Sequence, residues 1–174
     1  MEKIELEKIA INDSKQLQKI SRQTFFETFS SSNTEENMQK YLAERFSSDK
    51  MYNELNDENS EFYFAKIGNS IIGYFKLNFG VSQTELKDLG AAEIERIYVI
   101  KEFHGKKIGQ ILYDKAIEIA KQRKVDFVWL GVWEENLKAI NFYKRNGFVA
   151  FDKHIFKLGE DEQIDIMMKV KLNP

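Results

Sequence analysis

The sequence predicts an α/β fold in which about seven strands form one mixed sheet flanked by about four helices. Two observations predict it. Some segments alternate polar and apolar residues, the period of a strand, and others repeat apolar residues every three or four positions, the period of a helix. These segments follow the order strand, two helices, three strands, helix, strand, helix and two strands. Such an order is typical of a sheet that carries helices on both faces.

The elements of the first half are marked by apolar spacing and by capping residues. Residues 2–9 alternate charged and apolar side chains and predict a strand. Polar caps at 12–14 and 34–37 each precede apolar residues at helical spacing, so each predicts a helix. The β-rich runs 62–67 and 71–77 are joined by a short turn and predict an antiparallel pair.

The second half begins after a polar connection over residues 82–90. Its predicted elements are a strand over 92–99, a glycine-containing loop, a helix from about Gly109, a buried strand over 127–132, a helix after Asn136, and a strand pair over 148–156 and 164–170. No repeat or low-complexity linker interrupts this order, and the only proline is Pro174. We therefore expect a single domain over residues 1–174.

Composition narrows the classes of function. The chain has 174 residues, 43% hydrophobic, with 26 Lys and Arg against 28 Asp and Glu. The net charge of -2 gives no long-range attraction to nucleic acid or to an anionic membrane. Residues 1–8 alternate charged and apolar side chains and do not form a signal peptide or a membrane span. A soluble, cytoplasmic protein is expected.

The sequence contains no cysteine. This excludes a disulfide, a thiolate metal site and a cysteine nucleophile, and it is compatible with a reducing compartment. The chain also lacks a dense cluster of Cys and His residues, so no metal is expected.

The segment from Asn136 to Phe148 carries complete helix start and stop signals. Asn136 can cap the first turn, and Gly147 suits the left-handed conformation after the last turn. Ala139, Ile140 and Tyr143 fall on one side at 100° per residue. Tyr143 is therefore expected to face the core.

This segment and the strand and loop before it resemble the GNAT superfamily of acetyl-CoA-dependent N-acetyltransferases. The matching residues are Asn136, Ala139, Phe142, Tyr143, Gly147 and Phe148, together with the segment from Ile97 to Gly109. A closer resemblance, to bacterial PaiA-type polyamine N-acetyltransferases, rests on residues 93–99, 129–134 and 159–163. The resemblance implies a mostly antiparallel sheet whose fourth and fifth strands splay apart to admit acetyl-CoA.

The loop from Phe103 to Gly109 is the expected phosphate site. It lies between a strand and a helix, where free backbone N–H groups and the positive helix end attract anions. Alone, the loop is equally well a simple glycine-containing turn, and the later helix motif favours the cofactor. The residues expected to contact acetyl-CoA here are His104, Gly105, Lys106, Lys107, Ile108 and Gly109.

Two positions of this loop depart from the family pattern. His104 stands where relatives have Arg or Gln, and Lys107 stands where they have Gly. Because backbone amides bind the diphosphate, Lys107 is acceptable if its φ need not be positive, and its ammonium can favour the phosphates.

The resemblance implies further contacts with the cofactor. Main-chain groups of Ile97, Tyr98 and Val99 would pair with the pantetheine arm. Asn136 would meet the cofactor, and the alternative is that it is only a helix cap. Lys144 would reach the phosphates, although it can equally be a solvated residue that matches the helix dipole.

An alkylamine is protonated at neutral pH, so a base must remove a proton before the nitrogen attacks. Strand alternation puts Glu93, Glu95, Ile97 and Val99 on one face. Glu95 is the preferred base, since it resembles the strand-four Glu of polyamine-acetylating relatives, and Glu93 is the second choice. The alternative for Glu95 is an ion pair with Arg96 or a nearby Lys.

Tyr143 is the candidate donor to the sulfur that leaves, with a half-buried core tyrosine as the alternative. The N–H of Val99 is a candidate for holding the developing oxyanion. His104 and His154 form no evident triad, so direct transfer is expected.

A polyamine site requires carboxylates, and the candidates are Glu35, Glu36, Asp161, Glu162 and Asp165. The alternative is that these carboxylates are solvated surface residues without a role in substrate binding. The expected function is acetylation of a primary amine, in particular of a polyamine such as spermidine or spermine. Another small amine, an aminoglycoside or a protein amine are alternatives, as is a non-catalytic acetyl-CoA sensor. The resemblance also allows a homodimer.

Overall fold

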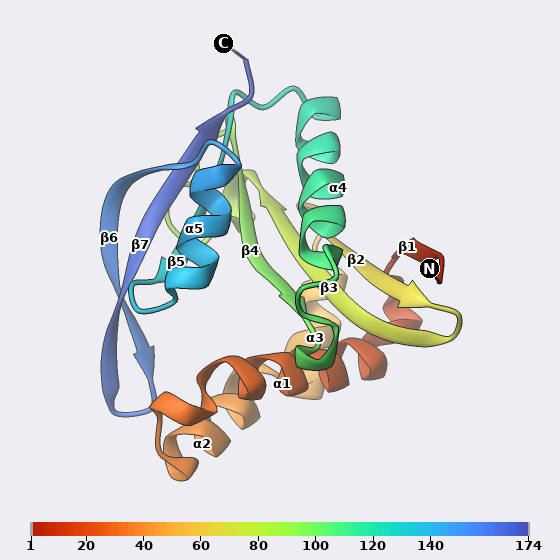
Figure 1. Ribbon diagram of the computed structural model, residues 1–174, viewed down its shortest axis with the longest axis vertical. Coiled ribbons are helices and arrows are strands. Elements are labelled where there is room, and N and C mark those ends of the chain that lie inside the picture. Colours follow the sequence, from red (N-terminus) through yellow and green to blue (C-terminus); the bar gives the residue numbers. More distant parts are fainter. Residues whose placement is uncertain (1, 174) are drawn as a thin grey trace.

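Seven strands form one sheet in the order β1-β2-β3-β4-β5-β7-β6 in the computed structural model, which describes residues 2–173 (Figure 1). The strands are β1 (Ile4–Lys8), β2 (Ser60–Ile67), β3 (Ser70–Phe79), β4 (Ala91–Val99), β5 (Phe127–Trp133), β6 (Val149–Leu158) and β7 (Asp161–Lys171). The β4–β5 pair is parallel, and the other neighbouring pairs are antiparallel. The predicted number of strands and the mixed, mostly antiparallel sheet are confirmed.

Five α-helices accompany the sheet in the described part of the chain. They are α1 (Ser14–Phe29), α2 (Glu35–Arg45), α3 (Ser48–Leu55), α4 (Ile108–Gln122) and α5 (Leu137–Arg145). The sequence predicted the others and missed α3. This helix has only eight residues and buries only Met51, so its apolar signal spans little more than two turns, although the Ser47 side chain caps it by accepting from the N–H of Lys50.

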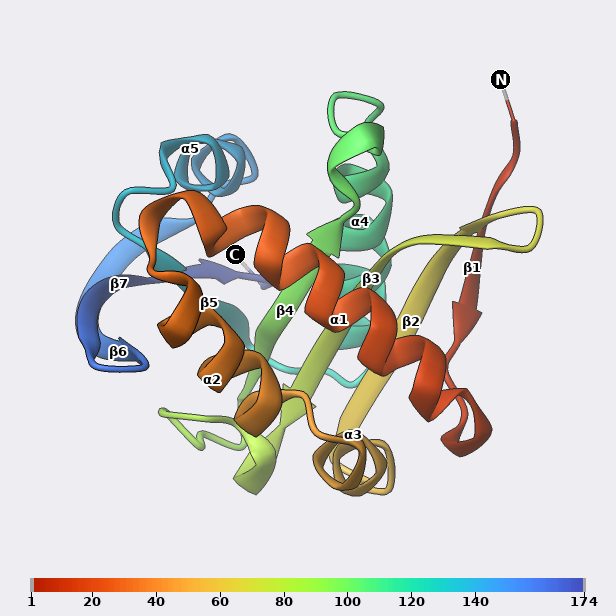
Figure 2. The ribbon, with the colours of Figure 1, turned by 90° about the horizontal axis from the view of Figure 1, so that it is seen from below.

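The helices cover the two faces of the sheet. On one face α4 buries Leu112, Ala116 and Ile119 in an apolar cluster that also contains Ile140 and Tyr143 of α5. On the other face α1 crosses the strands with α2 and α3 beside it (Figure 2). A second apolar cluster lies there and includes Leu17, Ile20, Phe25, Phe29, Met38, Tyr41 and Tyr74.

A bulge in the middle of β4 changes which residues face α4. The register with β3 shifts by one residue at Glu95. Ile94 before the bulge and Ile97 and Val99 after it all pack in the α4 cluster. The prediction that Glu93, Glu95, Ile97 and Val99 share one face is therefore wrong, because the inserted residue reverses the alternation on which it rested.

Strands β4 and β5 pair only over three residues, from Ala91 opposite Phe127 to Glu93 opposite Trp129. Beyond Glu93, β4 continues to Val99 beside β3 alone, while β5 continues to Trp133 beside β7. The two strands diverge along this part, as the resemblance implied (Figure 1). The second half of β4 is thus an open sheet edge inside the molecule.

Candidate functional site

The wedge between β4 and β5 opens into a cleft of about 1480 Å³. Its walls come from α1, α2, β4, the loop before α4, β5, α5 and β6. The cleft brings together most of the predicted site residues: Glu93, Glu95, Ile97, Tyr98, Val99, His104, Gly105, Lys107, Ile108, Gly109, Asn136 and Tyr143.

The main chain of β4 presents hydrogen-bonding groups to this wedge. The N–H of Ile100 donates to the carbonyl oxygen of Ile72 on the β3 side at 2.9 Å. Because antiparallel partners alternate, the main-chain groups of Val99 and Ile97 point away from β3, and those of Tyr98 point toward it. Two of the three predicted main-chain positions therefore face the open side.

The loop before α4 is shaped to receive an anion. The first intrahelical bond of α4 runs from the N–H of Ile111 to the carbonyl of Lys107, so the N–H groups of the preceding turn have no intrahelical acceptor. A Cβ added at Gly105 or Gly109 would meet nothing within 4 Å. The backbone is accessible here, and the helix dipole adds positive potential.

Two side chains hold this loop in place. His104 Nε2 lies 2.7 Å from the carbonyl oxygen of Val99 and links the loop to the end of β4. The Lys106 ammonium lies over the Phe103 ring, 4.8 Å from its centroid, and this side chain is not part of the cleft wall.

Lys107 adopts a left-handed conformation with φ of 63°. The condition on which the sequence made Lys107 acceptable, a φ that need not be positive, is not met. The turn from the loop into α4 requires a left-handed residue at the N-cap, where the family pattern has glycine, and a lysine there costs about 1 kcal/mol.

Asn136 caps α5, since its side-chain oxygen accepts a hydrogen bond from the N–H of Ala139 at 3.2 Å. It also lines the cleft. Lys144 is exposed outside the cleft wall, whereas Lys138 and Arg145 on the same helix line it. Their spacing of seven residues places these two cations on one helical face, which is the signal that could have identified them.

Tyr143 faces inward as predicted, with 7% of its surface exposed. Its ring lies 5.4 Å from that of Phe142 and 5.5 Å from that of Phe148, measured between centroids. Its hydroxyl has no hydrogen-bond partner among residues 2–173, and the residue lines the cleft. Burial raises the pKa of the phenol above its ordinary value, so the group stays neutral.

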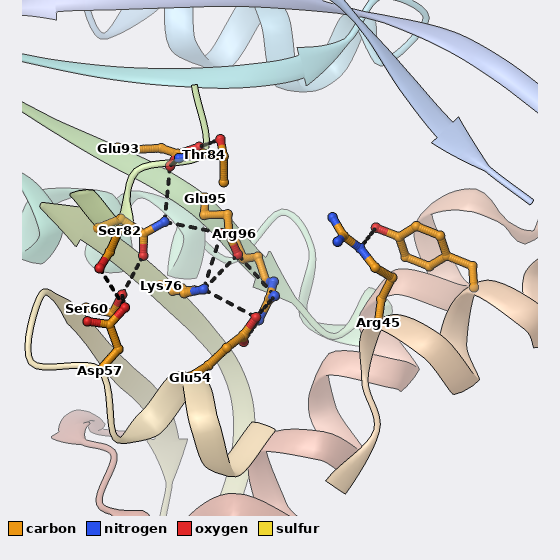
Figure 3. A network of polar contacts seen from close by, with 12 residues as sticks. Arg45, Glu54, Asp57, Ser60, Lys76, Ser82, Thr84, Glu93, Glu95 and Arg96 are labelled. Atoms are coloured by element: carbon orange, nitrogen blue, oxygen red, sulfur yellow. Dashed lines mark hydrogen bonds and ion pairs between the residues drawn. The ribbon is translucent and has the colours of Figure 1, made fainter. Parts of the chain in front are cut away.

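Glu95 lies in a network of charged groups (Figure 3). Its carboxylate is 3.1 Å from Lys76 Nζ and 3.0 Å from Arg96 Nη2. Both cations also contact Glu54 of α3, at 3.4 and 2.9 Å. Burial alone would raise the pKa of Glu95, but the two cations outweigh it and lower that pKa to about 2. The ion-pair alternative for this residue is therefore present in the structure.

Glu93 has a different environment, although it is only 3% exposed. Its carboxylate accepts hydrogen bonds from the N–H and hydroxyl of Thr84, at 2.8 and 2.5 Å, and from Asn78 Nδ2 at 3.1 Å. No Lys or Arg in the described chain lies within 4 Å of it. Burial raises the pKa of Glu93 above its ordinary value, and the hydrogen bonds from Thr84 oppose this only in part.

Of the predicted substrate carboxylates only Asp165 lines the cleft, whereas Glu35, Glu36, Asp161 and Glu162 are exposed and lie outside its wall. Asp161 accepts a hydrogen bond from Asn37 of α2 at 3.2 Å, so the two acidic segments do meet, but on the surface. The acidic residues that line the cleft are Glu27, Glu44, Glu85, Glu93, Glu95, Glu135 and Asp165.

His154 and Asp165 form a pair in the cleft, a contact that the sequence did not predict. They lie opposite each other on β6 and β7, with His154 Nε2 3.6 Å from Asp165 Oδ2. Burial raises the pKa of Asp165 to about 6, with a smaller opposing effect of His154. The residues are 11 positions apart in the chain, so only their strand pairing reveals the contact.

Neither a metal cluster nor a membrane-spanning helix is found in the described residues. No group of three or more His, Cys, Asp or Glu side chains there is arranged to hold a metal ion. No helix among them has the length and apolar character needed to cross a bilayer.

The sequence is similar to known acetyltransferases. Residues 15–148 match the model of the acetyltransferase (GNAT) family. An uncharacterized N-acetyltransferase in the pepI 3' region of Lactobacillus delbrueckii subsp. lactis is 40% identical over 153 residues, 88% of each chain. A spermidine N(1)-acetyltransferase of Thermoplasma acidophilum is 28% identical over 153 residues, which are 86% of this chain and 90% of the relative.

The structure is similar to that of the PaiA N-acetyltransferase from Thermoplasma acidophilum, which was crystallised in complex with coenzyme A. The TM-score is 0.80 at 26% sequence identity, over 97% of this chain and 99% of that one. The match of the family model covers more than half of the chain and includes the loop, β4 and α5 of the cleft. The chain is therefore an N-acetyltransferase that belongs to the acetyltransferase (GNAT) family, whose acetyl donor is acetyl-CoA.

Proposed function

We propose that this enzyme transfers the acetyl group of acetyl-CoA directly to a primary amine of a polyamine such as spermidine or spermine. The observation that carries the proposal is Glu93, a buried carboxylate that lines the cleft without a cationic partner. Such a group attracts a cationic amine and can take its proton. The similarity to a spermidine N(1)-acetyltransferase supports this class of acceptor. The lack of cysteine supports a cytoplasmic site of action.

The residues of the wedge fit acetyl-CoA. The main-chain groups of Ile97 and the N–H of Val99 suit the polar groups of the pantetheine arm and its thioester, and the N–H groups at the start of α4 suit the diphosphate. Lys107, Lys138 and Arg145 add positive charge on the same side of the cleft. When bound, the cosubstrate supplies an activated thioester carbonyl.

The proton of the amine goes to Glu93 in this proposal. An alkylammonium has a pKa near that of Lys, so its ionised form dominates at neutral pH and one proton must leave before attack. Glu93 has the raised pKa that suits an acceptor of this proton. Glu95, whose low pKa makes it a weak base, keeps Arg96 and Lys76 in place, and its own role as the base is the alternative.

The N–H of Val99 is suited to hold the negative charge that develops on the carbonyl oxygen. As the nitrogen–carbon bond forms and the carbon–sulfur bond breaks, Tyr143 donates a hydrogen bond to the sulfur. Its raised pKa opposes complete transfer of the phenolic proton, so stabilisation of charge is its main contribution. The nitrogen loses a second proton as the amide forms, and the released thiolate takes up one proton to become the free thiol. Direct transfer needs no cysteine, and the chain has none.

Release of free thiol from acetyl-CoA, measured against a panel of amines, tests the proposal. The panel contains spermidine, spermine, n-butylamine, an aminoglycoside and a peptide with a free N-terminus. Turnover that depends on a polyamine supports the proposal, and turnover with the other amines only would contradict it. Acetyl-CoA binding without turnover on any amine would instead support a sensor.

A further inference from the structure

Asp165 stands apart from the other carboxylates of the cleft. Glu93 and Glu95 are satisfied by the donors described above, and Glu27 accepts a hydrogen bond from the N–H of Lys101 at 2.6 Å. The remaining cleft carboxylates, Glu44, Glu85 and Glu135, are exposed to water. Within residues 2–173, Asp165 alone is a partly buried cleft carboxylate with neither a hydrogen bond nor a Lys or Arg within 4 Å.

Its one polar neighbour does not reach hydrogen-bond distance. His154 Nδ1 is buried and has no hydrogen-bond partner among the described residues, whereas Nε2 faces Asp165 Oδ2 at 3.6 Å. A proton on Nδ1 is a buried donor without an acceptor, which is costly, so Nε2 is the ring nitrogen suited to carry a proton. The Asp165 carboxylate is left without a hydrogen-bond donor among the described residues.

Gly131 on β5 leaves this pair open to the cleft. A Cβ at this position would lie 3.1 Å from His154 Cε1 and 3.4 Å from Asp165 Oδ2. Any side chain here would therefore crowd His154, contact the Asp165 carboxylate and cover both residues. The glycine forms a notch in the cleft wall in front of the carboxylate.

The notch also has a definite position relative to Glu93. Glu93 lies opposite Trp129 on β5, and Gly131 is two residues further along the same strand. Two residues advance a strand by about 7 Å. Glu93 and Asp165 are thus two carboxylates placed one after the other along the cleft.

We propose that Asp165, beside His154 and exposed through the Gly131 notch, binds a second ammonium group of the acceptor while the reacting amine lies at Glu93. This inference rests on the proposed function and names the feature that selects a diamine or polyamine over a monoamine. A buried carboxylate without a cation is stabilised by a ligand that supplies one. A monoamine that reacts at Glu93 leaves Asp165 unpaired.

The test compares spermidine with n-butylamine as acceptors of the wild-type enzyme and of Asp165→Asn. The substitution keeps the shape of the side chain and removes its charge. We expect kcat/KM for spermidine to fall about 10- to 100-fold, mainly through KM, because a charge-assisted contact is lost. We expect kcat/KM for n-butylamine and KM for acetyl-CoA to change less than about twofold.

Two further variants control for folding and for net charge. Asp152→Asn removes an exposed carboxylate of β6 outside the cleft and should leave kcat/KM for both acceptors unchanged. Gly131→Ala keeps the charge but covers it, and should lower the preference for spermidine as Asp165→Asn does. Circular dichroism and thermal melting confirm that each variant is folded.

The outcomes separate the two proposals. If the wild-type enzyme acetylates spermidine and Asp165→Asn lowers kcat/KM equally for both acceptors, or for neither, the second ammonium site is wrong and the proposed function stands. If wild type acetylates no diamine or polyamine, the proposed acceptor class fails and the inference fails with it. A selective loss with spermidine in both Asp165→Asn and Gly131→Ala supports the inference.

Discussion

Glu93 and Glu95 accept hydrogen bonds from the same amide group, although their carboxylates lie in opposite electrostatic environments. Asn78 Nδ2 is 3.1 Å from Glu93 Oε1 and 3.2 Å from Glu95 Oε1. Two cations surround Glu95, while the other donors to Glu93 are the neutral groups of Thr84 (Figure 3). One strand thus carries a carboxylate that is held ionised beside one whose environment favours uptake of a proton.

Glu93→Gln should lower kcat about 10²- to 10⁴-fold, the usual contribution of a general base. A base must be deprotonated, so activity is lost as pH falls through its pKa. Burial raises the pKa of Glu93 above the ordinary value of 4.5, so the acidic limb of the wild-type profile should lie above pH 4.5. Steady-state kinetics over pH measures both effects. An unchanged kcat, or an unchanged acidic limb, would return the role to Glu95.

Glu95→Gln should destabilise the protein by about 3 kcal/mol at neutral pH, because Lys76 and Arg96 lose a buried counter-ion. The folded-state pKa of about 2 lies below the ordinary value of 4.5. The stabilisation is therefore complete above pH 4.5 and disappears as pH falls toward 2. Urea denaturation of both proteins between pH 2 and 7 measures the difference. A difference that stays constant over this range would show that the carboxylate charge does not stabilise the fold.

Tyr143→Phe should lower kcat about 10²-fold while changing the free energy of unfolding by less than about 0.5 kcal/mol. The hydroxyl is not hydrogen-bonded to any described residue, so its removal breaks no contact of the fold. Tyr113→Phe is the matched control. Tyr113 packs in the same aromatic cluster, 5.8 Å from the Phe142 ring, but lies outside the cleft wall. Equal losses of kcat in the two variants would reduce Tyr143 to a packing residue.

Lys107→Gly should raise the free energy of unfolding by about 0.5 to 1 kcal/mol, because glycine adopts a positive φ without steric cost. It should also raise KM for acetyl-CoA about threefold through loss of one cation. Lys124→Gly is the control, since Lys124 has a similar φ of 57° at the other end of α4. It should give the same gain in stability with no change in KM. The same KM in both variants would show that the Lys107 ammonium does not contact the cofactor.

Asn136 has two candidate roles, as a helix cap and as a cofactor contact, and two substitutions distinguish them. Asn136→Asp keeps a capping oxygen, so stability should stay within about 0.5 kcal/mol, while the added negative charge should raise KM for acetyl-CoA. Asn136→Ala removes the bond to the Ala139 N–H and should cost about 1 kcal/mol. Thermal melting and KM are the measurements. An unchanged KM in Asn136→Asp leaves the residue as a cap only.

The local sequence pattern was sufficient to predict a side chain's orientation wherever that orientation depends on a single helix or strand. The apolar period of α5 placed Tyr143 toward the core, and the Asn136 cap forms as expected. The missed helix α3 has a capping serine, but it has only eight residues and one buried side chain, so its pattern is short. The strand alternation of β4 failed at Glu95, since a bulge depends on how β3 pairs and leaves no mark in the strand itself.

By itself the sequence determined the order of the strands and of every helix except α3, the family to which the chain belongs, and the inward face of Tyr143, because each depends on residues close together in the chain. Only the tertiary structure decided which charged side chains contact one another. Glu95 contacts Lys76, which is 19 residues away in the sequence, and Arg96 contacts Glu54, which is 42 residues away. The ionisation of Glu95 therefore depends on contacts between distant segments. The pairing of β6 with β7 likewise brought Asp165 to the cleft wall and left Asp161 and Glu162 in solvent.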